Sequence, residues 1–126
     1  MKRDWDSVRF LLTSLEALPN TDHYLSLSDF EFTDEEAVYS TSYHIEILIE
    51  AGLVEGKMLY TLDGGPTDFS ALRLTWAGHE FLDAIRNDTV WNKTKETFTT
   101  KGLDMTFETI KAVAAAAMTS MLGLSA

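Results

Sequence analysis

Residues 35–62 read EEAVYSTSYHIEILIEAGLVEGKMLYTL, and this stretch decides the fold that we expect. Apolar residues in its first part recur at three- and four-residue steps, which is typical of an amphipathic helix. Gly52 then predicts a helix end, because glycine tolerates the left-handed conformation usual just past a helix. Leu53, Val54 and the run 58–62 predict a strand. A helix that leads directly into a strand hairpin indicates a winged helix-turn-helix domain, although other small α+β domains share this arrangement.

The central helix, which Thr33 or Asp34 is expected to cap, has two distinct faces. The inward face is predicted to consist of Ala37, Val38, Thr41, Ile45, Leu48 and Ile49. The outward face is predicted to consist of Glu36, Tyr39, Tyr43, Glu46, Ile47 and Glu50. Tyrosines surrounded by polar groups are typical of protein–protein interfaces, so this face is the candidate binding site.

Composition and charge narrow the class of protein. The chain has 126 residues, the size of one domain, and 45% of them are hydrophobic. There is no cysteine, which excludes disulfides and thiolate metal sites and suits a reducing cytoplasm. No apolar run reaches membrane-spanning length and no signal peptide is evident, so we expect a cytoplasmic protein that makes no membrane contact. The net charge of −10 argues against a simple DNA-binding role, because such a chain repels a polyanion.

The segments around the central helix complete the predicted core. Asp4 is expected to cap a first helix. Residues 25–32 predict a short strand interrupted by a turn or bulge, with a very short helix as the alternative. A glycine-proline loop and a returning strand over 71–75 complete a β-hairpin, the wing. We therefore expect one α+β domain: a winged helix-turn-helix-like core over 1–87 (helix, short strand, central helix, β-hairpin wing) with additional C-terminal helices over 88–126.

The C-terminal extension is predicted to pack on the core or to form a dimer seam. Thr75 is expected to cap a helix that Asn87 and Asp88 either break or leave continuous, and Gly102 is expected to end the next helical stretch. The last helix, which Asp104 or Thr106 would cap, is rich in alanine, and small side chains permit close approach of another helix. A homodimer seam would use Ile110, Val113, Ala114, Ala117, Met118 and Met121.

Chemistry at the histidines is not well supported by the sequence. His79 and Asp83 have a spacing that can ligate a metal, but no third ligand can be named, and His79 is expected to cap or to pair with Asp83. His44 has a neighbouring carboxylate but no accompanying nucleophile, so we expect it to form hydrogen bonds at the edge of the core. We therefore predict no catalytic residue, no metal and no cofactor.

Several stretches carry a resemblance to a known family. They are MKRDWDSVRFLL at the start, YHIEILIEAGLVEG over 43–56, RLTWAGHEFLDAIR over 73–86, and Asp88-Thr89-Val90-Trp91 with Lys93 and Lys95 after it. In these the chain resembles the phage- and prophage-associated family known as domain of unknown function 2513. The resemblance implies a bacterial or phage cytoplasmic setting and carries no established activity. The pattern Leu-Thr-x-x-Gly after a strand also favours a winged helix, although little room is left here for the second helix of a helix-turn-helix.

Function is therefore expected to lie in protein contacts. We expect a non-enzymatic phage or prophage accessory or regulatory protein whose central helix binds a host or phage protein with a basic surface. In a DNA-reading helix, lysine, arginine, asparagine or glutamine would face the groove, whereas glutamates stand here. The main alternative is a winged-helix transcription regulator that binds DNA as a dimer through Lys2, Arg3, Arg9, Arg73 and Arg86.

Overall fold

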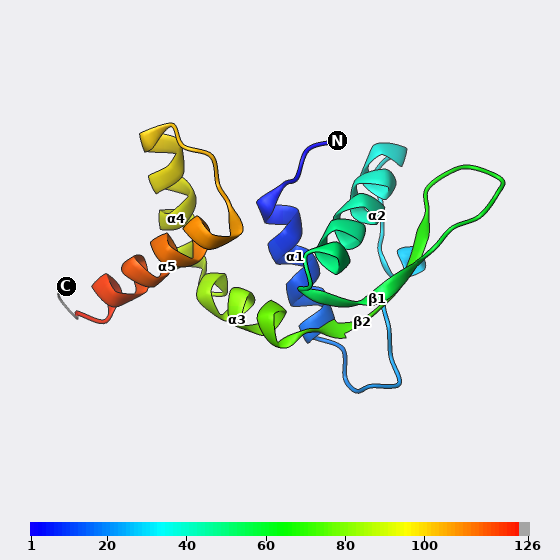
Figure 1. Ribbon diagram of the computed structural model, residues 1–126, viewed down its shortest axis with the longest axis horizontal. Coiled ribbons are helices and arrows are strands. Elements are labelled where there is room, and N and C mark those ends of the chain that lie inside the picture. Colours follow the sequence, from blue (N-terminus) through cyan, green and yellow to red (C-terminus); the bar gives the residue numbers. More distant parts are fainter. Residues whose placement is uncertain (124–126) are drawn as a thin grey trace. The chain divides into compact units, whose positions relative to one another are not determined.

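The computed structural model describes residues 1–123, which form five α-helices, one short 3₁₀ helix and one antiparallel two-stranded sheet (Figure 1). The elements follow in the order α1 (Trp5–Glu16), η1 (Leu27–Asp29), α2 (Glu35–Glu50), β1 (Val54–Leu59), β2 (Asp68–Leu74), α3 (Trp76–Ile85), α4 (Asp88–Lys101) and α5 (Phe107–Met121). The α+β class predicted from the sequence is confirmed. The chain divides into two compact units, residues 1–79 and residues from 80 onward, with the boundary inside α3.

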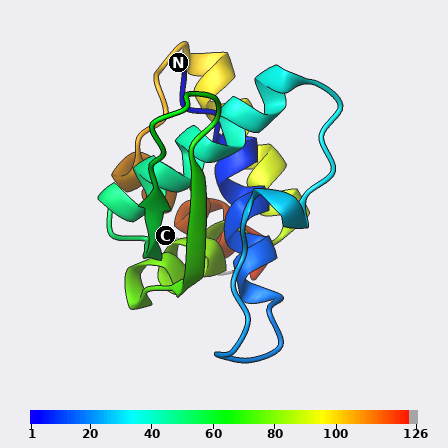
Figure 2. The same cartoon turned by 90° about the vertical axis from the view of Figure 1, so that its right-hand side faces the viewer.

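In the first unit, α1 and α2 pack on each other and on the hairpin (Figures 1 and 2). The Asp4 carboxylate accepts a hydrogen bond from the Ser7 backbone N–H at 3.1 Å and caps α1, as expected. Asp34 caps α2 in the same way through the Ala37 N–H at 2.8 Å. The core of this unit is formed by Val8, Leu11, Leu12, Leu15, Leu25, Ile45, Leu48, Leu53, Val54, Phe69, Ala71 and Leu74.

The segment before α2 differs from the predicted strand. Only Leu25 has strand character, in an isolated antiparallel bridge to Ala71 of β2. The chain then turns into η1, the alternative very short helix. This turn is stabilised because the Asp29 carboxylate accepts a hydrogen bond from the Ser26 N–H at 2.8 Å. Asp68 at the start of β2 accepts the Leu27 N–H at 3.0 Å, so the segment is attached to the hairpin.

The hairpin pairs β1 with β2, and its register shifts between Glu55 and Gly56. A Cβ atom on Gly56 would lie 2.5 Å from the Ser70 carbonyl oxygen, so the bulge requires glycine here. The strand predicted at Leu53, Val54 and residues 58–62 extended too far, because β1 ends at Leu59. Leu62 is fully exposed and has no sheet partner in the described register.

The C-terminal helices begin and end at the residues expected from their capping signals. Asn87 breaks the helix by capping α4, since its side chain accepts the Val90 N–H at 3.0 Å. Gly102 ends α4 in the left-handed conformation, and Thr106 caps α5. In the second unit, α5 packs on α4, and the rings of Phe81 and Phe107 stack with centroids 4.7 Å apart.

The predicted dimer seam requires a correction. Ile110 and Ala114 are completely buried inside the chain and are not available to a second copy. Val113, Ala117 and Met118 are half-buried, and Met121 is 49% exposed. The reason is geometric, since the side of α5 that carries Ile110 and Ala114 is used for packing within the chain.

Candidate protein-binding face of helix α2

The burial of α2 determines which side chains face outward. Ile45 and Leu48 are in the core as predicted, whereas Ala37, Val38, Thr41 and Ile49 are only half-buried. Two polar residues that were not assigned to the core, Ser42 and His44, are buried with them. The Ser42 hydroxyl donates to the Thr67 carbonyl oxygen at 2.5 Å, which connects α2 to the hairpin loop.

His44 is 1% exposed and uses both ring nitrogens in hydrogen bonds. Its Nδ1–H donates to the Ser40 carbonyl oxygen at 2.7 Å, and its Nε2 accepts the Asp4 backbone N–H at 2.8 Å. The expectation of hydrogen bonding is confirmed, although His44 lies inside the core and not at its edge. The residue joins α2 to the start of α1, and neither nitrogen is directed at an open site.

The six residues predicted as the binding face lie along one side of α2. Glu36, Tyr39 and Glu50 are exposed, with Tyr39 at 39%, whereas Tyr43, Glu46 and Ile47 are half-buried. The Tyr43 ring packs edge-on against His44, with centroids 5.6 Å apart. The Tyr43 ring therefore rests against a buried histidine.

Glu46 has a partner that the sequence did not reveal. Its carboxylate accepts a hydrogen bond of 2.5 Å from the hydroxyl of Tyr60, just beyond the end of β1. This hydrogen bond, together with desolvation and the negative charge of Glu46, raises the pKa of Tyr60 above its ordinary value of 10.0. The pair connects the outward face of α2 to the hairpin, which extends the candidate site beyond the helix. The packing of α2 against β1 brings Tyr60 to Glu46, so no local sequence signal could have identified the pair.

The hairpin loop adds another negative charge, the carboxylate of Asp63, to those of the α2 glutamates. A hydrogen bond from the Thr61 side chain, and another from the backbone of Asp63 itself, lower the pKa of the Asp63 carboxyl from its ordinary value of 3.8. Asp63 is therefore ionised at neutral pH. Tyr60 and Leu62 on either side of Thr61 are strongly exposed, at 71% and 107%.

A groove of about 720 Å³ lies at the first turns of α2. It is lined by Met1, Lys2, Glu35, Glu36, Tyr39 and Ser40. Only Glu36 and Tyr39 of the predicted face line it. The other four follow along the helix toward its C-terminal end, so the predicted face includes one side of a groove and the surface beyond it.

Charge is unevenly distributed along the chain. Residues 1–79 contain 14 acidic and five basic side chains, whereas residues 80–126 contain six acidic and five basic ones. Helix α2 has four glutamates and neither lysine nor arginine. The helix therefore carries a net negative charge at neutral pH.

Several of the basic residues proposed for DNA binding are engaged within the chain. The Arg73 guanidinium pairs with Glu55 at 2.9 Å, and that of Arg86 pairs with Asp83 at 2.6 Å. The Arg3 guanidinium lies over the Trp5 ring, 4.3 Å from its centroid.

The expected pairing of His79 with Asp83 is wrong. Asp83 pairs with Arg86, and the Nδ1 atom of His79 instead lies 3.9 Å from the Oε2 atom of Glu16.

Within residues 1–123, no group of three or more histidine, aspartate or glutamate side chains is arranged to hold a metal ion. No helix in this part of the chain is long and apolar enough to cross a membrane.

Fold and site together define a small α+β protein with an acidic, tyrosine-bearing helix face beside a β-hairpin. Residues 2–104 match the family described as "Hypothetical protein (DUF2513)", and the chain belongs to this family. It is similar to an uncharacterized protein of Haemophilus influenzae, with 42% identity over 122 residues that cover 97% of this chain and 99% of the relative. No solved structure matches the chain.

Proposed function

We propose that this chain is a non-enzymatic accessory or regulatory protein of the winged-helix type that binds a protein partner with a basic surface through α2. The observation that carries the proposal is the composition of the outward face of α2. It presents Glu36, Glu50 and partly Glu46 around Tyr39 and Tyr43, and the whole helix lacks lysine and arginine. Tyrosine supplies a large amphipathic contact area, and the acidic rim selects partners by charge.

The order of elements supports the winged-helix interpretation. The Leu25–Ala71 bridge adds a third, single-residue strand to the β1–β2 hairpin, in the sequence helix, strand, helix, hairpin. The three-residue η1 occupies the position where a helix-turn-helix has its second helix. A winged helix with this element reduced to one turn lacks the support that normally presents a recognition helix to DNA.

The proposed partner is therefore a protein and not a nucleic acid. A polyanion brought to α2 would meet the glutamates of that helix, together with Asp63 in the hairpin loop. Each close phosphate–carboxylate approach is repulsive and weakens as salt screens it. A basic protein surface is attracted by the same carboxylates, and this attraction mainly raises the rate of association. A role as a phage or prophage accessory or regulatory protein in the cytoplasm is part of the proposal and rests on the family resemblance of the sequence.

The test uses charge reversal at the two exposed glutamates of the face. Glu36→Lys/Glu50→Lys changes the sign of the surface without disturbing the Glu46–Tyr60 hydrogen bond. Affinity capture from bacterial lysate, with crosslinking and mass spectrometry, is expected to recover a basic protein with the unchanged chain and to lose it with the variant. A matched control, Asp104→Lys/Glu108→Lys, makes the same change in net charge at two exposed residues outside α2.

Capture that survives the α2 reversal, or that the control loses equally, contradicts the proposal. The DNA-binding alternative is measured separately by gel shift at low salt with random and phage-derived duplexes. A shift that weakens steeply as salt rises would favour that alternative, because counterion release marks phosphate contacts.

A further inference from the structure

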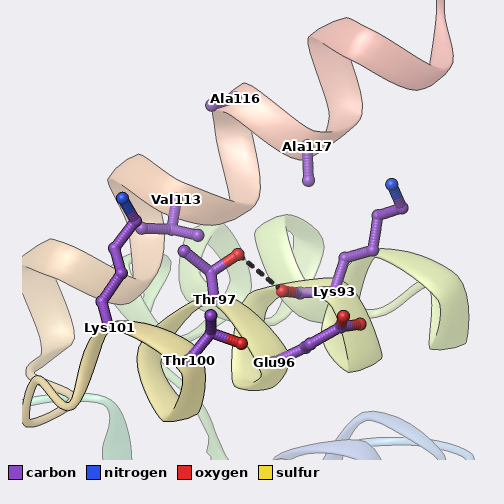
Figure 3. Close-up of a pocket in the computed structure, with 8 residues that line it drawn as sticks. All are labelled: Lys93, Glu96, Thr97, Thr100, Lys101, Val113, Ala116 and Ala117. Atoms are coloured by element: carbon purple, nitrogen blue, oxygen red, sulfur yellow. Dashed lines mark hydrogen bonds between the residues drawn. The ribbon is translucent and has the colours of Figure 1, made fainter.

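A second concave surface lies in the C-terminal unit, between α4 and α5 (Figure 3). It has a volume of about 530 Å³ and is lined by Lys93, Glu96, Thr97, Thr100, Lys101, Val113, Ala116 and Ala117. The side contributed by α5 consists only of Val113 and two alanines, so the helix backbone lies close to the surface. Small side chains at such positions allow another helix to approach closely.

The two helices run in opposite directions along this groove. In Figure 3, Lys101 lies beside Val113 at one end, and Lys93 lies beside Ala117 at the other. Met121, one helical turn beyond Ala117, and the neighbouring Leu122 are 49% and 68% exposed. The apolar surface therefore continues past the groove along α5.

The charges on the α4 side of the groove alternate in sign. Lys93 and Glu96 are three residues apart on α4, and both line the groove. Neither forms an ion pair within the part of the chain that the structure describes. If two α4 helices lie antiparallel across a two-fold axis, the Lys93 ammonium of each copy faces the Glu96 carboxylate of the other. One surface is thus complementary to itself, which is the requirement of a two-fold interface.

We infer that this groove is the interface of a homodimer in which the α4–α5 pairs of two copies pack into a four-helix arrangement. The apolar contact is made by Val113, Ala116, Ala117 and Met121, and two symmetric Lys93–Glu96 ion pairs fix the register. The interface differs from the predicted seam, because it leaves out Ile110, Ala114 and Met118 and adds Ala116 and the α4 residues. Pairing of two helix layers is a general way to cover an apolar helix face.

A second copy fits this groove better than an unrelated partner of one charge sign. A strongly acidic helix would pair with Lys93 and Lys101 but oppose Glu96, and a strongly basic helix would do the reverse. The residues from 80 onward are also close to electrically balanced, unlike the acidic first unit. Two copies can therefore approach through this unit with less repulsion than through residues 1–79.

Sedimentation velocity on the full chain tests the dimer directly. We expect a species of twice the 14.1 kDa chain mass to be populated as the concentration rises from about 1 µM to about 100 µM. Ala116→Arg is expected to raise the dissociation constant at least about tenfold, because a long charged side chain then occupies the contact. Ala115→Arg is the matched control, since Ala115 is also exposed in the chain but does not line the groove.

A charge swap distinguishes the proposed register from any other seam on α5. Lys93→Glu and Glu96→Lys each place like charges opposite one another, and each is expected to weaken the dimer about tenfold. The double variant Lys93→Glu/Glu96→Lys restores opposite charges and should recover the affinity of the unchanged chain. A chain that stays monomeric throughout the concentration series overturns the inference, as does a dimer that Ala116→Arg and Ala115→Arg affect equally. A double variant as weak as the single ones overturns the register.

Discussion

Gly78, in the first turn of α3, lies directly against the carbonyl oxygen of Leu53, and a Cβ atom at this position would overlap that oxygen. The neighbouring Thr75 strengthens the same junction. Its N–H donates to the Leu53 oxygen at 3.0 Å, its hydroxyl donates to the Gly52 oxygen at 2.5 Å, and the same hydroxyl accepts the Gly78 N–H at 3.1 Å. The pattern Leu-Thr-x-x-Gly thus joins the end of α2, the end of β2 and the start of α3.

Gly78→Ala is expected to destabilise the fold by about 3 kcal/mol, because the obstacle is backbone and cannot rotate away. This sign is opposite to the ordinary effect of glycine-to-alanine changes in helices, which stabilise by up to about 1 kcal/mol. Urea unfolding followed by circular dichroism measures this change in the free energy of unfolding. Ala77→Gly at the adjacent exposed position serves as the control and should cost about 1 kcal/mol or less. Equal stability of Gly78→Ala and the unchanged chain would show that the junction is not tight.

Thr75→Val keeps the shape of the side chain but removes the hydroxyl that both donates and accepts at the junction. The expected loss of unfolding free energy is about 1–2 kcal/mol, because the Gly78 N–H at the start of α3 loses its cap. Thr75→Ser retains the hydroxyl and should lose less. The same urea titration compares the three chains, and a serine variant as weak as the valine variant contradicts the role of the hydroxyl.

His44→Ala is expected to lower the unfolding free energy by about 2–4 kcal/mol. It leaves a cavity in the core and deprives the Asp4 N–H of its acceptor. Hydrogen exchange measured by NMR should show faster exchange of the Asp4 amide even under conditions where the fold persists. His23→Ala, in an exposed loop, is the control and should change stability by less than about 0.5 kcal/mol. Unchanged protection of the Asp4 amide would argue against the histidine as its anchor.

The Tyr60–Glu46 pair predicts a dependence of stability on alkaline pH. The pKa of Tyr60 is higher in the folded chain than its ordinary value of 10.0, so the folded state favours the protonated hydroxyl. The pair therefore contributes fully to the free energy of unfolding below pH 10. This contribution is lost as the pH rises through the pKa that Tyr60 has in the folded chain. Titration of the Tyr60 ring by NMR should give a lower pKa in the Glu46→Ala variant than in the unchanged chain. An identical pKa in both chains would mean that the hydrogen bond does not form in solution.

Local signals in the sequence determined most of the helix boundaries. Asp4, Asp34, Asn87 and Thr106 each cap the helix that follows them, and Gly102 ends α4. Capping depends on groups within three or four residues, so it can be read without knowing the tertiary structure. The charge of α2 is likewise a property of the sequence alone, and the candidate face follows from it once the inward side of the helix is known.

The tertiary structure decided which side chains on the helices and strands are buried, which are exposed and which pair with a distant residue. It assigned Ile110 and Ala114 to the core, buried His44 against the start of α1, and placed Tyr60 beside Glu46. It also replaced the strand predicted over 25–32 with η1 and a single bridge. Each of these outcomes depends on contacts between residues far apart in the chain. Periodicity gives the direction of a side chain around its own helix or strand, but the elements that pack against it decide whether that direction leads to solvent, to the core or to a partner residue.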